Sequence, residues 1–450
     1  MDQNLDFVVH TFGCKVNTYD SGLIQANMNR FGYQLLDKVD KNKAQIHILN
    51  TCAVTAEATQ EAVKVIRRIK SKQPFSTIVV TGCAAQVDTG AFENLPGADL
   101  VVANSHKGIL PELLNKFYKR ELTEKVFKSN IFKKDDLEAG GGTELSHTRS
   151  FLKIQDGCNS FCTFCIIPYA RGKSRSISIS ELIKRVNELV HLGKKEIVLT
   201  GVHIGDYEDE VSGQKKTLED LVEAILLKTS IARIRLSSLE PIELTDRLLQ
   251  LYSDSRLCPH FHMSIQSANT EVLFEMKRKY DHLSVEKALN QIYKKLSNPF
   301  VGMDVIAGFP TETDSQFEDT YQRLSVLPWT KIHVFPYSER QGTRAAVFNQ
   351  IPFHQRKERA SQLRQLSSHR YQSELLKQKN TENSALILKS DLMINGMQYF
   401  EGLTENYFPV LVKSDLMLKA GSIQKIQIDQ LHNISEEPRL LGHILQEVMQ

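Results

Sequence analysis

The chain has 450 residues, of which 41% are hydrophobic and 24% charged, so about three domains of roughly 150 residues each are expected. Its 56 Lys and Arg residues and 53 Asp and Glu residues leave a net charge of +3, which does not indicate a nucleic-acid partner. The odd count of seven cysteines argues against a disulfide-bonded secreted protein. Neither a signal peptide nor an apolar run of about 20 residues is visible, so we expect a cytoplasmic protein without a membrane span.

Residues 1–125 alternate short apolar runs with amphipathic stretches, a pattern that predicts an α/β domain with a parallel sheet. Strands are expected at 7–9, 46–49, 77–80 and 100–103. Helices are expected over 19–32 and 57–73. The acidic, glycine-rich segment 134–146 has no apolar period and indicates a linker, which we place over 126–148.

Residues 149–345 repeat the alternation with longer units. Six strands are expected, at 151–155, 196–200, 231–237, 261–265, 300–306 and 331–335. Helical periodicity between them, as over 179–192 and 285–296, indicates a series of six βα units. Eight units would close a standard barrel, so six predict a partial (β/α)6 barrel with a lateral opening.

The last part of the chain divides into a basic helical connection over 346–383 and a β-rich module over 384–450. Residues 344–379 hold eight Lys or Arg and only two Asp or Glu. A basic helix is usually a solvated face, but the module that follows has the strand spacing of a small barrel and four aromatic residues, Tyr399, Phe400, Tyr407 and Phe408. We therefore expect RNA binding, with phosphate contacts from Arg356, Arg359, Arg364 and Arg370.

Three clustered cysteines, Cys158, Cys162 and Cys165, follow the first strand of the predicted barrel with C-x3-C-x2-C spacing. A structural zinc site would need a fourth ligand, and no further Cys or His is near. Three thiolates instead suit an iron–sulfur cluster with one open coordination position. The motif resembles that of the radical S-adenosylmethionine (SAM) enzymes. The resemblance implies a 4Fe–4S cluster whose open iron chelates SAM, and reductive cleavage of SAM to a 5′-deoxyadenosyl radical.

Three scattered cysteines, Cys14, Cys52 and Cys83, each follow a predicted strand of the first domain. The carboxyl ends of parallel strands share one edge of the sheet, so we expect the three thiols to meet there. The alternative is a set of three unrelated core cysteines, because buried cysteines are common. The repeated placement at strand ends favours a shared site.

Together, GCKVN, NTCAVT, GCAAQ and GCNSFCTFCIIPYARG resemble the motifs of the methylthiotransferases over nearly the whole chain. The resemblance implies a second 4Fe–4S cluster on Cys14, Cys52 and Cys83 that carries the donated sulfur. It also implies two uses of SAM, as methyl donor and radical source, and a C-terminal RNA-binding TRAM domain. Lys15 and Val16 make the chain most similar to the branch that converts N6-threonylcarbamoyladenosine at position 37 of tRNA to its 2-methylthio derivative. Isopentenyladenosine-37 tRNA or a ribosomal-protein aspartate is the alternative substrate.

If the barrel prediction holds, strand ends on the cluster face line the cofactor site. The candidates are Thr200, Gly201, Ser237, Glu240, Gln266 and Asp304. Gly201 would let the backbone approach the cofactor, and Glu240 would accept hydrogen bonds from ribose hydroxyls. The alternative role for each is closure of the barrel mouth. The chain departs from the family pattern at Ala268 and Thr311, which affects cofactor contacts rather than cluster ligands.

Other residues have simpler interpretations. Cys258 has no partner motif and is expected to be a spectator, and His10, His203, His260 and His262 are expected to be packing residues. An electron donor such as flavodoxin or ferredoxin is implied by the chemistry, whereas the sequence leaves the oligomeric state open. From another class of function, a non-catalytic RNA-binding protein with structural metal sites is the alternative.

Overall fold

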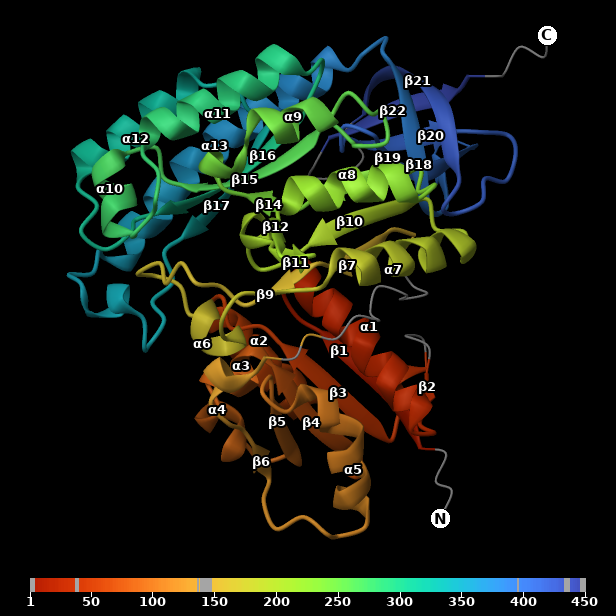
Figure 1. Cartoon of the computed structure of the whole chain (residues 1–450), viewed down its shortest axis with the longest axis vertical. Coiled ribbons are helices and arrows are strands. Elements are labelled where there is room, and N and C mark those ends of the chain that lie inside the picture. Colours follow the sequence, from red (N-terminus) through yellow and green to blue (C-terminus); the bar gives the residue numbers. More distant parts are fainter. Residues whose placement is uncertain are drawn as a thin grey trace.

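The computed structural model describes residues 5–36, 40–135, 137, 148–394, 396–432 and 438–445. It contains three parts that follow one another along the chain (Figure 1). An N-terminal α/β domain lies at one end and a central α/β domain covers it, while a small β-barrel packs beside the central domain. The predicted fold class, a mixed α/β chain ending in a β domain, is confirmed.

The N-terminal domain is a six-stranded parallel sheet in the order β2-β1-β3-β4-β5-β6. Its strands are β1 (Asp6–Thr11), β2 (Gln34–Leu35), β3 (Ile46–Thr51), β4 (Thr77–Gly82), β5 (Leu100–Ala103) and β6 (Val126–Phe127). Apolar side chains of α1 (Lys15–Arg30) and α5 (Leu110–Tyr118) pack on one face. The other face is covered by α2 (Ala56–Lys72), α3 (Cys83–Val87) and α4 (Gly90–Glu93).

The strand order reverses between β1 and β3, because β1 has β2 on one side and β3 on the other. Ligands of open α/β sheets bind outside the carboxyl ends of the strands at such a reversal. Both edge strands escaped prediction because two residues are too short to show a pattern. The edge strand β6 continues the sheet past residue 125, the predicted end of the first domain. Within the predicted linker, residue 136 and residues 138–147 lie outside the described residues.

The central domain contains parallel strands in two adjoining sheets, β7-β10-β13 and β14-β15-β16-β17. The strands are β7 (Ser150–Lys153), β10 (Glu196–Thr200), β13 (Arg233–Leu236), β14 (Ser238–Leu239), β15 (His260–Gln266), β16 (Phe300–Ala307) and β17 (Lys331–Pro336). The strand predicted over 231–237 corresponds to β13. Ser237 separates β13 from β14, and the two strands belong to different sheets. Among the described strands no pairing joins β7 to β17, which is the open partial barrel that six units predict.

Helices cover the outside of this partial barrel. They are α7 (Ile179–His191), α8 (Leu218–Lys228), α9 (Asp246–Leu251), α10 (Thr270–Glu275), α11 (His282–Lys295) and α12 (Asp314–Val326). Their apolar faces and the strands form one core that includes the fully buried Trp329. The short helix α6 (Ile167–Arg171) follows the cysteine loop. Two small antiparallel sheets pair β8 (Gln155–Asp156) with β9 (Arg175–Ser176) and β11 (Asp209–Val211) with β12 (Gln214–Lys216).

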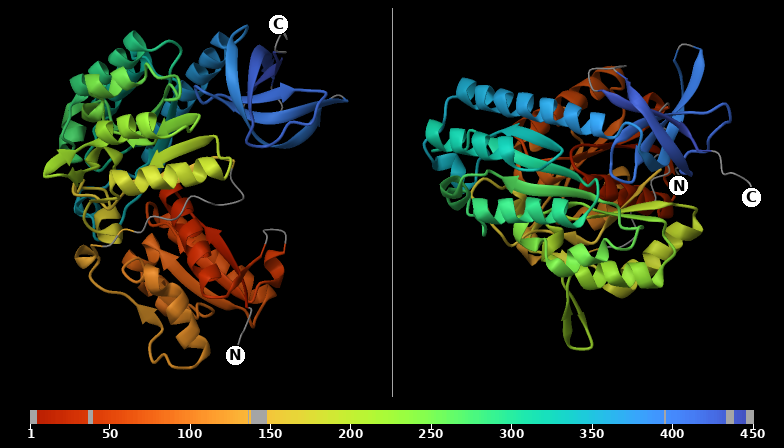
Figure 2. Two further views of the ribbon diagram at one scale, coloured as in Figure 1. Left: turned by 45° about the vertical axis from the view of Figure 1, so that its right-hand side comes forward. Right: turned by 90° about the horizontal axis from the view of Figure 1, so that it is seen from above.

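The basic connection is one long helix, α13 (Phe353–Lys377), which runs along the central domain toward the C-terminal barrel (Figure 2). Its arginines point to the central domain. Arg359 is buried and pairs with Glu312 at 2.7 Å, and Arg370 donates to the carbonyl oxygen of Ser325. Arg356 and Arg364 also donate to backbone carbonyls. These contacts join α13 to the central domain, and phosphate contacts from the same four arginines stay a prediction.

The C-terminal module is a closed five-stranded barrel in the order β18-β19-β20-β22-β21. Its strands are β18 (Glu382–Ile394), β19 (Met397–Thr404), β20 (Pro409–Lys413), β21 (Ile423–His432) and β22 (Arg439–Ile444). Phe400 and Phe408 lie in its core, so they are not available to stack on bases. Arg233 and Arg235 of β13 donate to backbone carbonyls of this barrel, which docks it on the central domain.

Candidate active site

A cavity of about 730 Å³ lies where the three domains meet. Its wall includes the three scattered cysteines, Cys14, Cys52 and Cys83. The central barrel contributes Thr200, Gly201 and Ser237 from strand ends and Asp304 from inside β16. The C-terminal barrel adds Leu403, Tyr407 and Pro409. The cavity thus connects the carboxyl edge of the N-terminal sheet with the mouth of the partial barrel.

Hydrogen bonds hold the three cysteine loops together. The buried Asn17 side chain donates to the carbonyl oxygens of Phe12 and Thr51, at 2.8 and 3.0 Å. The Thr51 hydroxyl donates in turn to the carbonyl oxygen of Thr81 at 2.6 Å. Each of these three carbonyls lies within two residues of one of the cysteines. Asn17 and Thr51 therefore fix the relative positions of the strand ends that carry the thiols.

Local backbone also shapes the first cysteine set. Gly13 has φ +86°, and a Cβ atom at this position would lie 2.6 Å from the sulfur of Cys52. Cys14 caps the N-terminus of α1, whose dipole favours a thiolate, but burial outweighs the favourable interactions and raises the pKa of Cys14. Burial and the neighbouring Cys83 sulfur raise the pKa of Cys52 to about 12. The glycine leaves space in which the thiols of Cys14 and Cys52 can come close together.

The clustered cysteines lie on the loop between β8 and α6 and are partly buried. The Arg278 guanidinium donates to the Cys162 sulfur at 3.0 Å. Burial and the neighbouring Cys162 and Cys158 sulfurs raise the pKa of Cys165 to about 12. Burial disfavours the thiolate of Cys158 as well, but hydrogen bonds from His203 and Ser160 outweigh it and lower the pKa of Cys158. The loop thus combines three neighbouring thiols with cationic donors that stabilise negatively charged sulfur.

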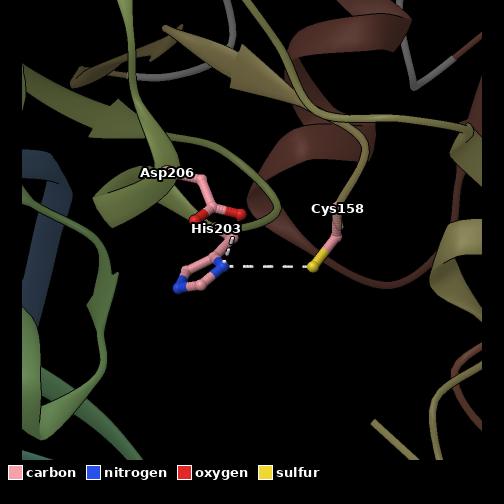
Figure 3. A group of neighbouring side chains, drawn as sticks. All are labelled: Cys158, His203 and Asp206. Carbon is pink, nitrogen blue, oxygen red and sulfur yellow. Dashed lines mark hydrogen bonds and ion pairs between the residues drawn. The ribbon is translucent and has the colours of Figure 1, made fainter. Parts of the chain in front are cut away.

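His203 is the centre of a polar cluster beside this loop, shown with Cys158 and Asp206 in Figure 3. Its Nδ1 atom lies 3.0 Å from Asp206 and 3.9 Å from the Cys158 sulfur, and its Nε2 atom lies 2.5 Å from Glu243. Burial alone would lower the pKa of His203, but these acceptors raise it well above its usual range. A protonated imidazole is the consequence, in place of the packing residue that we expected.

A buried ionic network joins the N-terminal and central domains between the two cysteine sets. Arg171 of α6 pairs with Asp156 at 2.8 Å and with Asp20 of α1 at 3.0 Å. Lys153 pairs with Asp20 at 2.6 Å, and Lys107 pairs with the same carboxylate at 2.9 Å. These cations outweigh the effect of burial and lower the pKa of Asp20 well below its usual value. No motif analysis of one domain would reveal this network, because its members come from both.

The six predicted cofactor residues do not all line the cavity. Four of them line the cavity, whereas Glu240 lies beside the cysteine loop and pairs with Arg278 at 2.6 Å. Gln266 ends β15 with φ +63°, next to a break in strand register. Asp304 accepts a hydrogen bond from His262 at 2.8 Å, and the buried Ser237 hydroxyl has no partner among the described residues. The buried, unpartnered hydroxyl is the feature of this set that a bound molecule would satisfy.

Comparison with known proteins places these features in one family. The radical SAM superfamily matches residues 152–324, and an uncharacterised protein family, UPF0004, matches residues 6–103. The threonylcarbamoyladenosine tRNA methylthiotransferase MtaB of Rickettsia prowazekii is 36% identical over 431 residues, which cover 95% of this chain and 96% of the relative. The chain belongs to the MtaB methylthiotransferase family. It is therefore a radical SAM enzyme that uses an iron–sulfur cluster and SAM, which argues against a non-catalytic RNA-binding protein.

A related branch is also similar. The tRNA-2-methylthio-N(6)-dimethylallyladenosine synthase of Staphylococcus saprophyticus is 31% identical over 373 residues, which cover 81% of this chain and 71% of the relative. Among solved structures, the radical SAM methyltransferase TsrM of Kitasatospora setae shares the fold with a TM-score of 0.57 and 14% identity, over 76% of this chain and 77% of TsrM. None of the described helices has the length and apolar character needed to cross a membrane.

Proposed function

We propose that this enzyme attaches a methylthio group to C2 of N6-threonylcarbamoyladenosine at position 37 of tRNA. The observation that supports this activity is the shared cavity, whose wall combines Cys14, Cys52 and Cys83 with strand ends of the radical SAM barrel. A base inserted there would contact the sulfur-donating side and the radical-generating side together. The MtaB relatives of Rickettsia prowazekii and Aquifex aeolicus are named for the same substrate.

Two 4Fe–4S clusters fit the two cysteine sets. Cys158, Cys162 and Cys165 supply three thiolates for the cluster that binds SAM, and three ligands leave one iron open. Cys14, Cys52 and Cys83 supply the same number at the sheet edge, where Gly13 leaves room that a side chain would fill. The donor chemistry suits iron and sulfide, because thiolates are soft ligands.

When bound, these cofactors supply the methyl group, the sulfur and the one-electron chemistry needed to replace an unactivated C–H bond. The chain itself positions and insulates the reacting groups. Arg278 neutralises charge at Cys162 and orients Glu240, which we assign to the ribose of SAM. Thr200, Gly201, Ser237, Gln266 and Asp304 complete the cofactor side of the site.

The three domains divide the work in this proposal. The N-terminal domain, which extends to β6, donates the sulfur, and the central domain generates the radical. The C-terminal TRAM-like barrel binds the tRNA. The enzyme works in the cytoplasm and takes electrons from a carrier such as flavodoxin or ferredoxin. The exposed Phe335 at the cavity wall is suited to stack on the target adenine.

Nucleoside analysis of tRNA tests the proposed substrate. In cells that lack the gene, mass spectrometry should show loss of the 2-methylthio form of threonylcarbamoyladenosine, with the unmethylthiolated nucleoside in its place. The 2-methylthio form of isopentenyladenosine should be unchanged. Loss of the isopentenyl derivative instead would assign the chain to the other branch, and loss of neither from tRNA would point to the ribosomal-protein aspartate.

A further inference from the structure

The wall of the cavity carries more basic than acidic side chains among its described residues. Among its described residues it carries three basic side chains, Lys15, Arg171 and Lys331, and one carboxylate, Asp304. Asp304 is bonded to His262, and Arg171 is engaged by the Asp156 and Asp20 carboxylates of the buried network. Lys15 and Lys331 are the other two basic side chains of the wall.

The two lysines come from different domains and line the same cavity. Lys15 follows Cys14 at the start of α1, and Lys331 begins β17 of the barrel. The ammonium group of Lys331 lies 4.7 Å from the ring of Tyr371, which also lines the cavity. Burial lowers the pKa of His333. His262, Lys331 and Lys15 lower that pKa further, and Asp304 opposes them. Both lysines therefore line the same cavity as His333.

We infer that Lys15 and Lys331 bind the carboxylate of the N6 substituent and so select threonylcarbamoyladenosine over isopentenyladenosine. The inference rests on the proposed function. A threonylcarbamoyl group carries a carboxylate, whereas the dimethylallyl group of the other branch is apolar and uncharged. An ammonium pair in a cavity favours the first and gains nothing from the second. The lysines act as specificity-determining residues, separate from the cysteines that hold the clusters.

The test compares RNA ligands that differ only at this substituent. Anticodon stem-loops would carry N6-threonylcarbamoyladenosine, its neutral methyl ester, or N6-isopentenyladenosine at position 37. Binding to the anaerobically reconstituted full-length enzyme would be measured by fluorescence anisotropy. We expect the wild-type enzyme to bind the acid about tenfold or more tightly than the ester, as a charge-assisted contact predicts.

Variants assign this preference to the lysines. Lys331→Met and Lys15→Met should each reduce the ratio of acid to ester affinity by several-fold, and Lys331→Arg should retain much of it. Lys357→Met is the matched control, because Lys357 also lies over an aromatic ring, Phe353 at 4.5 Å, but on α13 outside the cavity wall. It should change the affinities for acid and ester equally, if it changes them at all.

Three results would overturn the inference. Equal wild-type affinity for acid and ester would show that the carboxylate is not read. Equal weakening of acid and ester binding by Lys331→Met and Lys15→Met would show that the lysines contact RNA phosphates instead. An unchanged acid preference in both variants would place recognition elsewhere. Failure of the proposed function is distinguished by product analysis, because the wild-type enzyme would then methylthiolate the isopentenyl RNA and not the threonylcarbamoyl RNA.

Discussion

The two cysteine sets contain the same number of thiols but are built in different ways. Cys158, Cys162 and Cys165 belong to one short loop, so a local motif is enough to bring them together. Cys14, Cys52 and Cys83 lie at three strand ends and depend on the whole sheet and on the Asn17 and Thr51 hydrogen bonds. The loop set also has cationic donors, Arg278 and His203, whereas the strand-end set lines an open cavity. Cysteines on one loop can be contacted by side chains from several sides. Cysteines at the ends of parallel strands lie at the edge of a sheet, where a substrate can reach them.

Alanine substitutions are expected to give the largest difference in activity between the two cysteine sets. Cys158→Ala should abolish SAM cleavage, because the cluster that binds SAM loses a ligand. Cys14→Ala should permit SAM cleavage and stop formation of the methylthio product. Each variant should lose about four iron atoms per chain relative to the wild type. The measurements are 5′-deoxyadenosine and product by chromatography, and iron by elemental analysis.

Cys258→Ala is the matched control for these variants, because Cys258 is fully buried away from the cavity wall. It should keep both iron content and SAM cleavage. Methylthiolation by Cys14→Ala would contradict the assignment of the sulfur-donating role to the N-terminal domain.

Asp20→Asn tests the ionic network that connects the two sets. Removing one charge of a buried ionic network leaves its partners uncompensated, so we expect a loss of about 3–5 kcal/mol in the free energy of unfolding at pH 7. The pKa of Asp20 is depressed in the folded chain below its usual 3.8, so its contribution is complete above that pH. The difference between wild type and variant should shrink as the pH falls below about 3.8, as measured by urea denaturation.

Arg278→Met tests the cationic environment that is specific to the loop set. Loss of the guanidinium leaves the Cys162 thiolate without its donor and Glu240 without its partner. Outer-shell substitutions at metal sites typically cost about 10–100-fold in affinity or activity, and we expect a decrease of that size in SAM cleavage. Electron paramagnetic resonance should show a changed signal from one cluster only. Changes in both signals would mean that Arg278 supports the fold in general.

Gly13→Ala tests the strand-end set by steric means, with the smallest expected effect. The added methyl group would meet the Cys52 sulfur and would impose a left-handed φ on alanine, at a cost of about 1–3 kcal/mol. Gly32→Ala is the control, because Gly32 has a similar φ of +88° and nothing within 4 Å. Iron loss in Gly13→Ala and full iron content in Gly32→Ala would separate the steric effect from backbone strain. Equal iron content in both would show that the space beside Cys52 is not needed.

The sequence was most informative where a pattern is local or follows from parallel strands. Placement of Cys14, Cys52 and Cys83 at strand ends predicted a shared cavity wall, because parallel strands have a common carboxyl edge. Pairing between domains was not visible, since Asp20 and Arg171 meet only after both domains have folded. His203 was taken for a packing residue because a single histidine has no pattern of its own. The arginines of α13 show a similar limit, because a basic stretch does not reveal that Arg359 faces a buried Glu312.

The participation of the C-terminal barrel in the cavity wall has a consequence for biosynthesis. A nascent chain that ends before β19 already contains all six cysteines, the sheet and the partial barrel. It lacks Leu403, Tyr407 and Pro409, so the chamber has no wall on that side. Synthesis of the last strands therefore completes the wall of the cavity on that side. Before that point, iron and sulfide can approach Cys14, Cys52 and Cys83 from the side that the C-terminal barrel later covers.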